Sequence, residues 1–301
     1  MARILITDPI AEEGVALLKQ AGHEVVVQPE WKGDLLKEHI GAYEVLIVRS
    51  ATRVTADILR AGKHLRIVGR AGVGLDNIDV DTARKLGIQV VNTPGATTIA
   101  VAELTVAMIL ACLRHLCAAH ASMQQGRWDK KAFKGAELYG KTVGIIGCGR
   151  IGQAVAQRLQ AFGCRILGYD PLVQETPGIH LVPLETLLKE SQIVTLHVPL
   201  TDETRHLLQR ETLSLLPRGA IVVNTARGGV VKEDDLLEFL ETGHVACAAL
   251  DVYETEPLPP DHPLRRSPKV LLTPHIGAQT REGQVRAAVD LARKIVDLLK
   301  P

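Results

Sequence analysis

Short runs of aliphatic residues alternate along this chain with longer stretches in which apolar positions recur every three or four residues. The runs have the length of buried strands, and the stretches between them have the period of helices. Strands that are buried on both faces are continuously aliphatic rather than alternating. The pattern therefore predicts an α/β protein in which doubly wound parallel sheets are covered by helices on both faces.

The first part of the chain contains five of these runs. We predict strands over 3–7, 24–27, 45–48, 66–68 and 88–91, with helices over 12–21, 33–43, 56–61 and 80–86. Asn92-Thr93-Pro94-Gly95 then interrupts the pattern before a long apolar helix over 99–113, because proline and glycine end regular elements. We interpret this helix as the crossing into a second domain.

The second part continues the alternation and ends in an amphipathic helix. We predict strands before Gly147 and over 165–169, 193–197, 220–224, 246–250 and 270–272, and helices over 153–162 and 281–299. A length of 301 residues suits two domains. If the last helix returns to the first domain, residues 1–96 with 282–301 form one Rossmann-like domain, and 97–281 form an inserted second one with a cleft between the two.

Composition and charge narrow the classes of function. The net charge is +1, and charged residues make up 23%, so nothing indicates a nucleic-acid or anionic-membrane partner. The five cysteines lack paired spacing and are expected to be small buried side chains in a reducing compartment. Met1-Ala2-Arg3 leads directly into the first strand, which leaves no room for a signal peptide. We therefore expect a cytoplasmic protein that binds no membrane.

The segment Gly147-Cys148-Gly149-Arg150-Ile151-Gly152 lies between a predicted strand and a predicted helix. Its glycines allow a tight turn, close approach of a pyrophosphate, and close packing of helix and strand. The helix N-terminus then faces the phosphates with unpaired N–H groups. The next strand ends at Asp170, whose carboxylate can bind a ribose diol and disfavours the 2′-phosphate of NADP. This order predicts an NAD site.

Three side chains follow the carboxyl ends of predicted strands, the edge where open α/β sheets bind ligands. They are Arg227, Glu256 and His275, with Glu254 as a competing carboxylate. An imidazole can exchange a hydroxyl proton near neutral pH, a carboxylate can fix its tautomer, and a guanidinium can hold a carboxylate and polarise a carbonyl. The set would suffice for hydride transfer to or from a 2-hydroxy or 2-oxo acid. No metal is expected, because no His/Cys ligand spacing is present.

Four ordered motifs give the whole chain a resemblance to the D-2-hydroxyacid dehydrogenase family. They are Gly147–Gly152 with Asp170, Asn224-Thr225-Ala226-Arg227-Gly228-Gly229, the stretch from Asp251 to Glu256-Pro257, and Thr273-Pro274-His275-Ile276-Gly277-Ala278. The resemblance implies that Arg227, Glu256 and His275 are catalytic, which favours Glu256 over Glu254.

The resemblance also implies which residues line the cofactor site. Arg150 and Ile151 would lie on the pyrophosphate, Val198 and Pro199 beneath the adenosine, and a further group near the nicotinamide. That group comprises Thr225, Ala226, Asp251, Gly277 and Ala278, and Val73 is expected to contact the cofactor as well. For Asp251, capping of a strand end is an alternative interpretation. A homodimer, built on the helix over 99–113 and the segment after it, or a homotetramer is implied as well.

Within the family, the chain is most similar to the branch that oxidises D-3-phosphoglycerate in serine biosynthesis. The similarity lies in Val48-Arg49-Ser50-Ala51-Thr52, in 69–77 and in 121–128. It implies that N–H groups around Ser50, Ala51, Val73 and Gly74 bind the carboxylate. Arg49, Arg70 and Lys130, the last from a partner subunit, would face the phosphate.

Two departures and two rival functions remain. The loop Pro94-Gly95-Ala96-Thr97 lacks the asparagine of many relatives, and the end at Pro301 leads us to expect no regulatory module. A glyoxylate or hydroxypyruvate reductase resembles the same family over the same length. A dinucleotide-sensing protein that resembles corepressors is the rival of a different class.

Overall fold

The computed structural model describes residues 1–300 and divides the chain into two compact units. The smaller unit comprises Met1–Thr98 and the C-terminal segment that begins at Ala278, and the larger unit comprises Ile99–Gly277. The sequence placed these junctions at 96/97 and 281/282. Both units are α/β, so the predicted fold class is confirmed.

The smaller unit is built on a five-stranded parallel sheet. Its strands are β1 (Arg3–Ile6), β2 (Glu24–Val27), β3 (Val45–Val48), β4 (Ile67–Arg70) and β5 (Gln89–Asn92), in the order β2-β1-β3-β4-β5. The helices between them are α1 (Glu12–Gln20), α2 (Gly33–His39), α3 (Ala56–Ala61) and α4 (Val80–Lys85), with a 3-10 turn over Ile40–Ala42. The order reverses between β1 and β3, which makes that junction the switch point of the sheet.

The last helix, α11 (Arg281–Leu298), packs on the smaller unit, as predicted. It lies so close to α1 that a Cβ atom on Gly14 would be 2.7 Å from the carbonyl oxygen of Ala288. Leu291 and Ile295 of α11 contact the sheet at Gly69 and are fully buried. The two ends of the chain therefore share one hydrophobic core.

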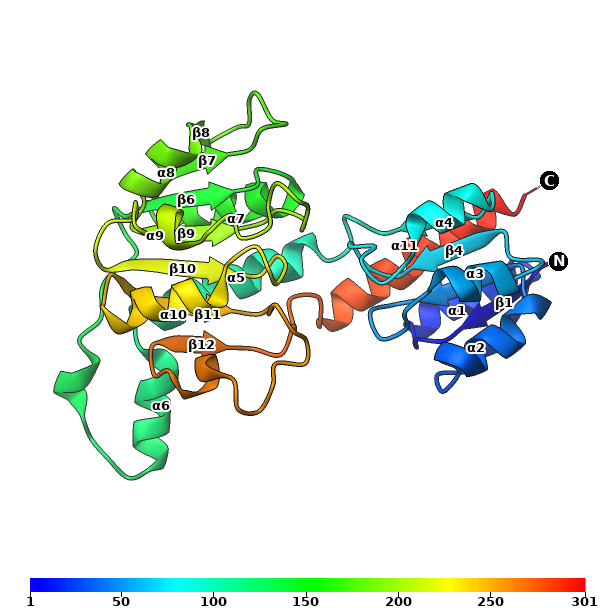
Figure 1. Ribbon diagram of the computed structural model, residues 1–301, viewed down its shortest axis with the longest axis horizontal. Coiled ribbons are helices and arrows are strands. Elements are labelled where there is room, and N and C mark those ends of the chain that lie inside the picture. Colours follow the sequence, from blue (N-terminus) through cyan, green and yellow to red (C-terminus); the bar gives the residue numbers. More distant parts are fainter. Residues whose placement is uncertain (301) are drawn as a thin grey trace. The chain divides into compact units, whose positions relative to one another are not determined.

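The larger unit contains seven parallel strands (Figure 1). They are β6 (Thr142–Ile146), β7 (Arg165–Tyr169), β8 (His180–Leu181), β9 (Ile193–Leu196), β10 (Ala220–Asn224), β11 (Val245–Leu250) and β12 (Val270–Leu272). The order is β12-β11-β10-β9-β6-β7-β8, so the switch point lies between β6 and β9. Nearly all side chains of β6, β9 and β10 are buried, as expected of strands covered on both faces.

The helices of the larger unit include several that the sequence analysis did not predict. They are α5 (Thr98–Leu113), α6 (Leu116–Gln124), α7 (Arg150–Ala161), α8 (Leu184–Glu190), α9 (Arg210–Leu213) and α10 (Glu233–Glu241), with 3-10 turns over Lys130–Phe133 and Pro263–Arg266. The prediction that α7 begins at Gln153 was wrong. Helical structure begins at Arg150, because Gly152 lets the first turn pack on the loop before it.

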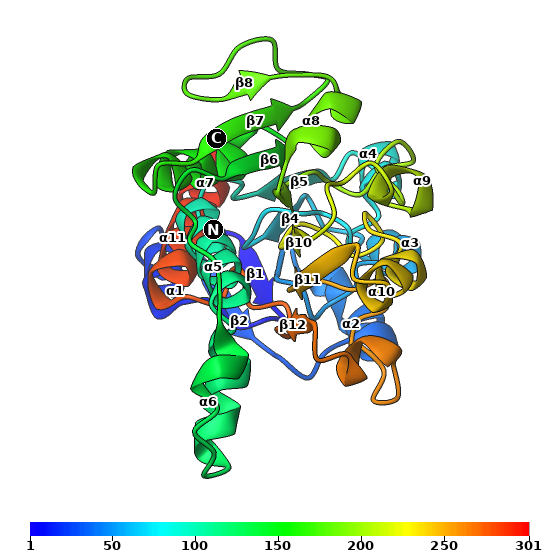
Figure 2. The ribbon, with the colours of Figure 1, turned by 90° about the vertical axis from the view of Figure 1, so that its left-hand side faces the viewer.

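Helix α6 stands apart from the sheet of its own unit in both ribbon views (Figures 1 and 2). No single helix within residues 1–300 is long and apolar enough to cross a membrane. In the described part of the chain, only α5 and α6 taken together reach that length and composition, and they are bent by 65° at their junction.

Candidate active site

The glycine loop joins β6 to α7 at the switch point of the larger sheet. Gly147 has φ of +94°, and a Cβ atom there would lie 2.7 Å from the carbonyl oxygen of His197. A Cβ atom on Gly152 would lie 2.1 Å from the carbonyl oxygen of Gly147, so the helix packs directly on the turn. Gly149, in contrast, faces open space within 4 Å. The loop thus forms a cradle that a side chain at 149 would fill, and it fits a pyrophosphate.

Asp170 lies beside this cradle, at the end of β7. Its carboxylate accepts hydrogen bonds from the N–H groups of Cys148 and Leu172, both at 2.9 Å. The acid is therefore held against the loop, where a dinucleotide's ribose would meet it. His197, on the other side of the loop, contributes no charge, because burial lowers its pKa to about 3.

Arg227, Glu256 and His275 follow β10, β11 and β12, which are three neighbouring strands. Since the strands are parallel, their carboxyl ends meet at one edge of the sheet. Within the group, Nδ1 of His275 lies 2.7 Å from Oε2 of Glu256. The side chains of His275 and Glu256 remain 44% and 36% exposed. The hydrogen-bonded pair therefore exists without a bound ligand, and both of its side chains are accessible to solvent.

The carboxyl group of Glu256 is held in its ionised form. Burial alone would raise its pKa, but the hydrogen bond and charge of His275, the N–H of Tyr253 and the charge of Arg227 together lower it. The Tyr253 N–H donates to Oε1 at 3.1 Å. Glu254 points elsewhere, since its carboxylate accepts from the N–H of Glu233 at 3.1 Å. Thus Glu256, and not Glu254, contacts the imidazole.

The loop that carries Arg227 is fixed by a side chain that the sequence analysis did not single out. Asn224 donates through Nδ2 to the carbonyl of Arg227 at 2.9 Å and accepts through Oδ1 from the N–H of Ala226 at 3.0 Å. The next residue, Gly228, packs so tightly that a Cβ atom would lie 1.7 Å from the carbonyl oxygen of Tyr253. Only glycine lets the arginine loop approach the glutamate loop this closely.

The loop that carries His275 is fixed by Asp251, which is 1% exposed. Oδ1 accepts from the hydroxyl of Thr273 at 2.6 Å and from the N–H of Ile276 at 2.8 Å, and Oδ2 accepts from the N–H of Gly277 at 2.8 Å. His275 itself adopts a left-handed backbone conformation, with φ of 53°. This conformation is uncommon for a side chain other than glycine, and the bonds to Asp251 on either side of His275 hold it in place.

Comparisons with known proteins agree with this geometry. Residues 106–277 match the model of a family described as D-isomer specific 2-hydroxyacid dehydrogenase, NAD binding domain. The chain belongs to this family. It is accordingly an NAD-dependent oxidoreductase, and the glycine loop and strand-end triad lie in the family's NAD-binding domain.

Two similar relatives differ in name and in length. The chain is 48% identical to a hydroxypyruvate reductase of Thermotoga maritima over 298 residues, which cover 97% of each chain. It is also 48% identical to a D-3-phosphoglycerate dehydrogenase of Methanocaldococcus jannaschii over 305 residues, which cover 100% of this chain and 58% of that one. The chain thus spans little more than half of the phosphoglycerate dehydrogenase.

Two solved structures superpose on most of the chain. A Staphylococcus aureus NAD-dependent formate dehydrogenase in complex with NAD has a TM-score of 0.87 at 32% identity and covers 98% of this chain and 94% of its own. A Thermus thermophilus protein has a TM-score of 0.89 at 38% identity and covers 96% and 94%.

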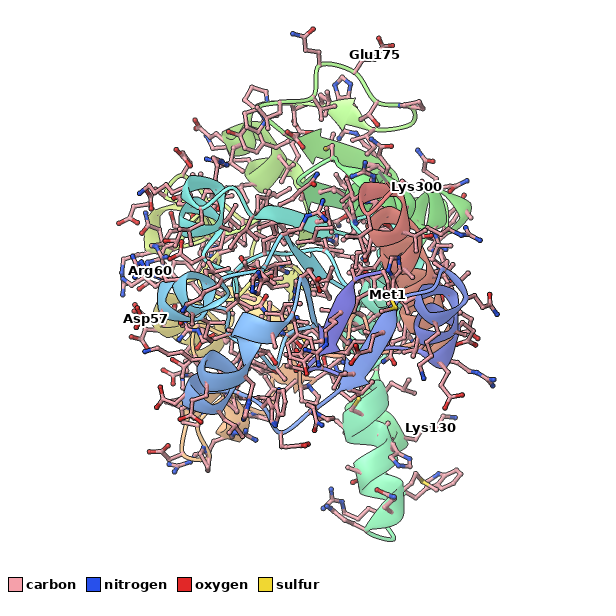
Figure 3. The ribbon with its side chains drawn as sticks, turned by 90° about the vertical axis from the view of Figure 1, so that its right-hand side faces the viewer. Met1, Asp57, Arg60, Lys130, Glu175 and Lys300 are labelled. Atoms are coloured by element: carbon pink, nitrogen blue, oxygen red, sulfur yellow. The ribbon has the colours of Figure 1, made fainter. Side chains whose placement is uncertain are left out.

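The other dehydrogenase site residues predicted in the larger unit lie at strand ends or on the surface. Thr225 and Ala226 are buried beside β10, where the Thr225 hydroxyl bonds to that of Thr105 at 2.8 Å. Val198 and Pro199 follow β9 and so flank the switch point. Lys130 is exposed in the 3-10 turn after α6 (Figure 3). Their roles toward cofactor and substrate stay predictions.

The remaining predicted residues belong to the smaller unit. Arg49 lines a small pocket with Thr97, Ala278 and Gln284. Arg70 donates through Nε to the carbonyl of Arg49 at 3.3 Å, and through Nη1 to the carbonyl of Gly74. Arg70 therefore supports two loops of the unit, a role that the sequence did not indicate. Within residues 1–300, no group of three or more His, Cys, Asp or Glu side chains could hold a metal ion.

Proposed function

We propose that the chain oxidises D-3-phosphoglycerate to 3-phosphohydroxypyruvate with NAD as the hydride acceptor. The observation that carries the chemistry is the 2.7 Å contact between His275 and Glu256 beside Arg227. The substrate is suggested by relatives named D-3-phosphoglycerate dehydrogenase, which match essentially the whole chain. Arg49, which lines a pocket of the smaller unit, is the cation proposed to meet the phosphate.

His275 is proposed to move the hydroxyl proton. Its Nδ1 is occupied by Glu256, so Nε2 is the nitrogen available to accept a proton from the hydroxyl group at C2. The ionised Glu256 stabilises the imidazolium that forms and keeps the ring oriented. In the reverse direction the same imidazolium returns the proton to the developing alkoxide.

Arg227 is proposed to bind the substrate's carboxylate and to polarise the adjacent oxygen. A guanidinium presents paired donors that match a carboxylate. It also favours the charge that gathers on the C2 oxygen during reaction. Bound NAD supplies the electrophilic ring carbon that takes up the hydride. The chain itself holds the proton acceptor His275 and the carboxylate-binding Arg227 in a fixed position relative to the substrate.

Reduction of hydroxypyruvate is the second candidate. The Thermotoga maritima relative with that name is as similar as the phosphoglycerate dehydrogenases. Arg70 also donates hydrogen bonds to two backbone carbonyls, which argues against its assignment to the substrate's phosphate. Since 3-phosphohydroxypyruvate and hydroxypyruvate are the same 2-oxo acid with and without a phosphate, recognition of the phosphate separates the two candidate functions.

A substrate panel with NAD and NADP, run beside one matched pair of variants, tests the proposal. We expect turnover of D-3-phosphoglycerate with NAD. We expect Arg49→Ala to raise the KM for this substrate by about 100-fold while changing that for hydroxypyruvate a few-fold, since a charge-assisted contact is worth about 1.5–3 kcal/mol. Arg53→Ala is the control, because Arg53 is exposed in the same segment. Equal effects of Arg49→Ala on both substrates would refute phosphate recognition there. Turnover of hydroxypyruvate alone would favour the second candidate.

The proposal extends to assembly and location. Leu116, Met123 and Trp128, on α6 and just after it, are 61%, 54% and 78% exposed. Such an apolar arm suits contact with a second copy of the chain, as a homodimer or homotetramer in the cytoplasm. Sedimentation velocity tests this, and a monomer at micromolar concentration would contradict it.

A further inference from the structure

At the switch point of the smaller sheet, Asp8 and Asn77 make contacts to which no role has been given so far. In a sheet of order β2-β1-β3-β4-β5, the loops after β1 and β3 flank the point where the connections reverse. Open α/β sheets bind ligands in the crevice at such points. Asp8 follows β1, and Arg49-Ser50-Ala51-Thr52 follows β3.

Asp8 is a buried carboxylate that binds this second loop at both ends. It is 3% exposed. Oδ2 accepts from the N–H of Arg49 at 2.7 Å and from the N–H of Thr52 at 3.0 Å, and Oδ1 accepts from the Thr52 hydroxyl at 2.7 Å. Lys32 completes the set with an ion pair of 2.7 Å to Oδ1. Four donors therefore surround one carboxylate.

Asn77 binds the backbone carbonyl groups of the same loop. Its Nδ2 donates to the carbonyl of Arg49 at 2.8 Å and to the carbonyl of Thr52 at 2.6 Å. The backbone N–H and the backbone carbonyl of Arg49 and of Thr52 are thus all bound by side chains from other loops. The two residues between them, Ser50 and Ala51, are exposed, and within residues 1–300 their N–H groups have no acceptor.

We infer that Asp8 and Asn77 are positioning residues. They hold the Arg49–Thr52 loop in a conformation that leaves free the N–H groups of Ser50 and Ala51, which the family resemblance assigns to the substrate's carboxylate. The inference rests on the proposed function. A loop of four residues that had to order itself on binding would lose about 1–2 kcal/mol per residue. With Asp8 and Asn77 in place, the backbone donors are oriented before the acid arrives.

A merely structural role for Asp8 would lower stability and leave the kinetic constants of the folded enzyme unchanged. A positioning role predicts a selective effect on substrate affinity. Because the carboxylate is common to all candidate acids, the effect should be the same with and without a phosphate on the substrate. Cofactor binding should not respond, since the glycine loop belongs to the other unit.

The first experiment is Asp8→Asn, whose amide keeps the shape but loses the charge and turns a donor toward the loop. We expect KM for hydroxypyruvate and for 3-phosphohydroxypyruvate to rise at least about tenfold, with kcat within about threefold and the dissociation constant of NADH unchanged. Asp57→Asn is the control. Asp57 is 68% exposed on α3, where it pairs with Arg60 (Figure 3), and its variant should match the wild type. A folded Asp8→Asn enzyme with wild-type KM would overturn the inference, as would a loss confined to kcat.

Thr52 provides a second pair of variants in case Asp8→Asn does not fold. Thr52→Val removes the hydroxyl that donates to Asp8, and Thr52→Ser restores it. We expect KM to rise several-fold in the first and to return toward the wild-type value in the second. Equal KM values in the two variants would overturn the inference.

A direct binding measurement separates this inference from the proposed function. Oxalate, a non-reacting dicarboxylate, should shift the amide NMR signals of Ser50 and Ala51 in the wild-type enzyme with NADH, and less so in Asp8→Asn or Thr52→Val. If the wild type turns over no acid but these shifts occur, the proposed function fails and the inference stands. If turnover is present but oxalate leaves both signals unchanged, the inference fails alone.

Discussion

Asp8 in the smaller unit and Asp251 in the larger unit make the same kind of contacts with a loop, each at the edge of a different sheet. Each follows the carboxyl end of a strand, each is at most 3% exposed, and each accepts bonds from the loop after the adjacent strand. In both cases the donors from that loop are two backbone N–H groups and one threonine hydroxyl, from Thr52 and Thr273 respectively. A buried carboxylate is thus used twice to shape a loop at a ligand-binding edge.

The two regions differ in what their loops present. The loop held by Asp8 presents backbone N–H groups, which can receive an anion. The loop held by Asp251 forces His275 into a left-handed conformation, with its imidazole on Glu256. Asp8 also has a lysine partner, whereas the donors that Thr273, Ile276 and Gly277 direct at Asp251 are all uncharged. Under the proposed function, the same arrangement of a buried carboxylate and a loop serves substrate binding in one unit and proton transfer in the other.

The largest expected effect tests whether Asp251 acts through His275. His275→Ala should lower kcat by about 10²–10⁴-fold, because it removes the proposed acid and base. Asp251→Asn should lower kcat by about 10–100-fold in the wild type, because one N–H of the histidine loop loses its acceptor. In the His275→Ala background the same change should have almost no further effect on kcat. The measurement is a double-mutant cycle at saturating NADH.

The cycle also separates two roles for Asp251. If Asp251→Asn lowers the residual turnover of His275→Ala as strongly as that of the wild type, the two residues act independently. A weaker NADH affinity in that case would support the role at the nicotinamide that the family resemblance implies. The parallel with Asp8 would then hold for structure and not for function.

The architecture could be predicted from the sequence because buried strands appear in it as continuous aliphatic runs. Strands such as β3 and β10 are continuous aliphatic runs, and they span the same residues as predicted. Strand β8 has only two residues, which is too short for any period. Helices α8 and α10 have only seven and nine residues, so few positions are available in which a helical period could show. Such elements depend on tertiary packing more than on local pattern.

The site was predictable only where chemistry and position coincide. Arg227 and His275 stand out because a reactive side chain follows a buried strand. Asp8 gives the same signal, a polar residue directly after an aliphatic run, but many such residues simply end a strand. Asn77 gives no signal, because its two acceptors are 25 and 28 residues away in the sequence. Long-range partners of this kind become visible only once the sheet order is known.

The second prediction concerns the free energy of unfolding at acid pH, to which the buried carboxylate of Asp8 should contribute. Burial alone would raise the pKa of Asp8, but the bonds from Lys32, Thr52 and Arg49 hold it below its usual value. The folded state therefore prefers the ionised form. The resulting stabilisation is complete above about pH 4 and is lost as the pH falls through the lower, folded-state pKa.

Asp8→Asn should destabilise the smaller unit by about 2 kcal/mol at pH 7, and the difference from the wild type should shrink toward acid pH. Trp31 reports on this unit, because the other tryptophan, Trp128, lies in the larger one. Urea unfolding monitored by fluorescence in a Trp128→Phe background measures the effect. A constant difference between pH 3 and pH 7 would show that the charge of Asp8 is not what stabilises the loop.

The smallest expected effect is the sharpest test of the comparison, because it uses the same atoms in both regions. Thr273→Val removes the hydroxyl that donates to Asp251 at 2.6 Å, as Thr52→Val removes the one that donates to Asp8 at 2.7 Å. We expect Thr273→Val to lower kcat about three- to tenfold with little change in the KM of the 2-oxo acid, and Thr273→Ser to recover most of the loss. Thr52→Val should do the reverse and raise KM with little change in kcat. If both valine variants change the same kinetic constant, the two carboxylates do not divide binding and proton transfer between them, and the similarity of their contacts reflects only how parallel sheets close their loops.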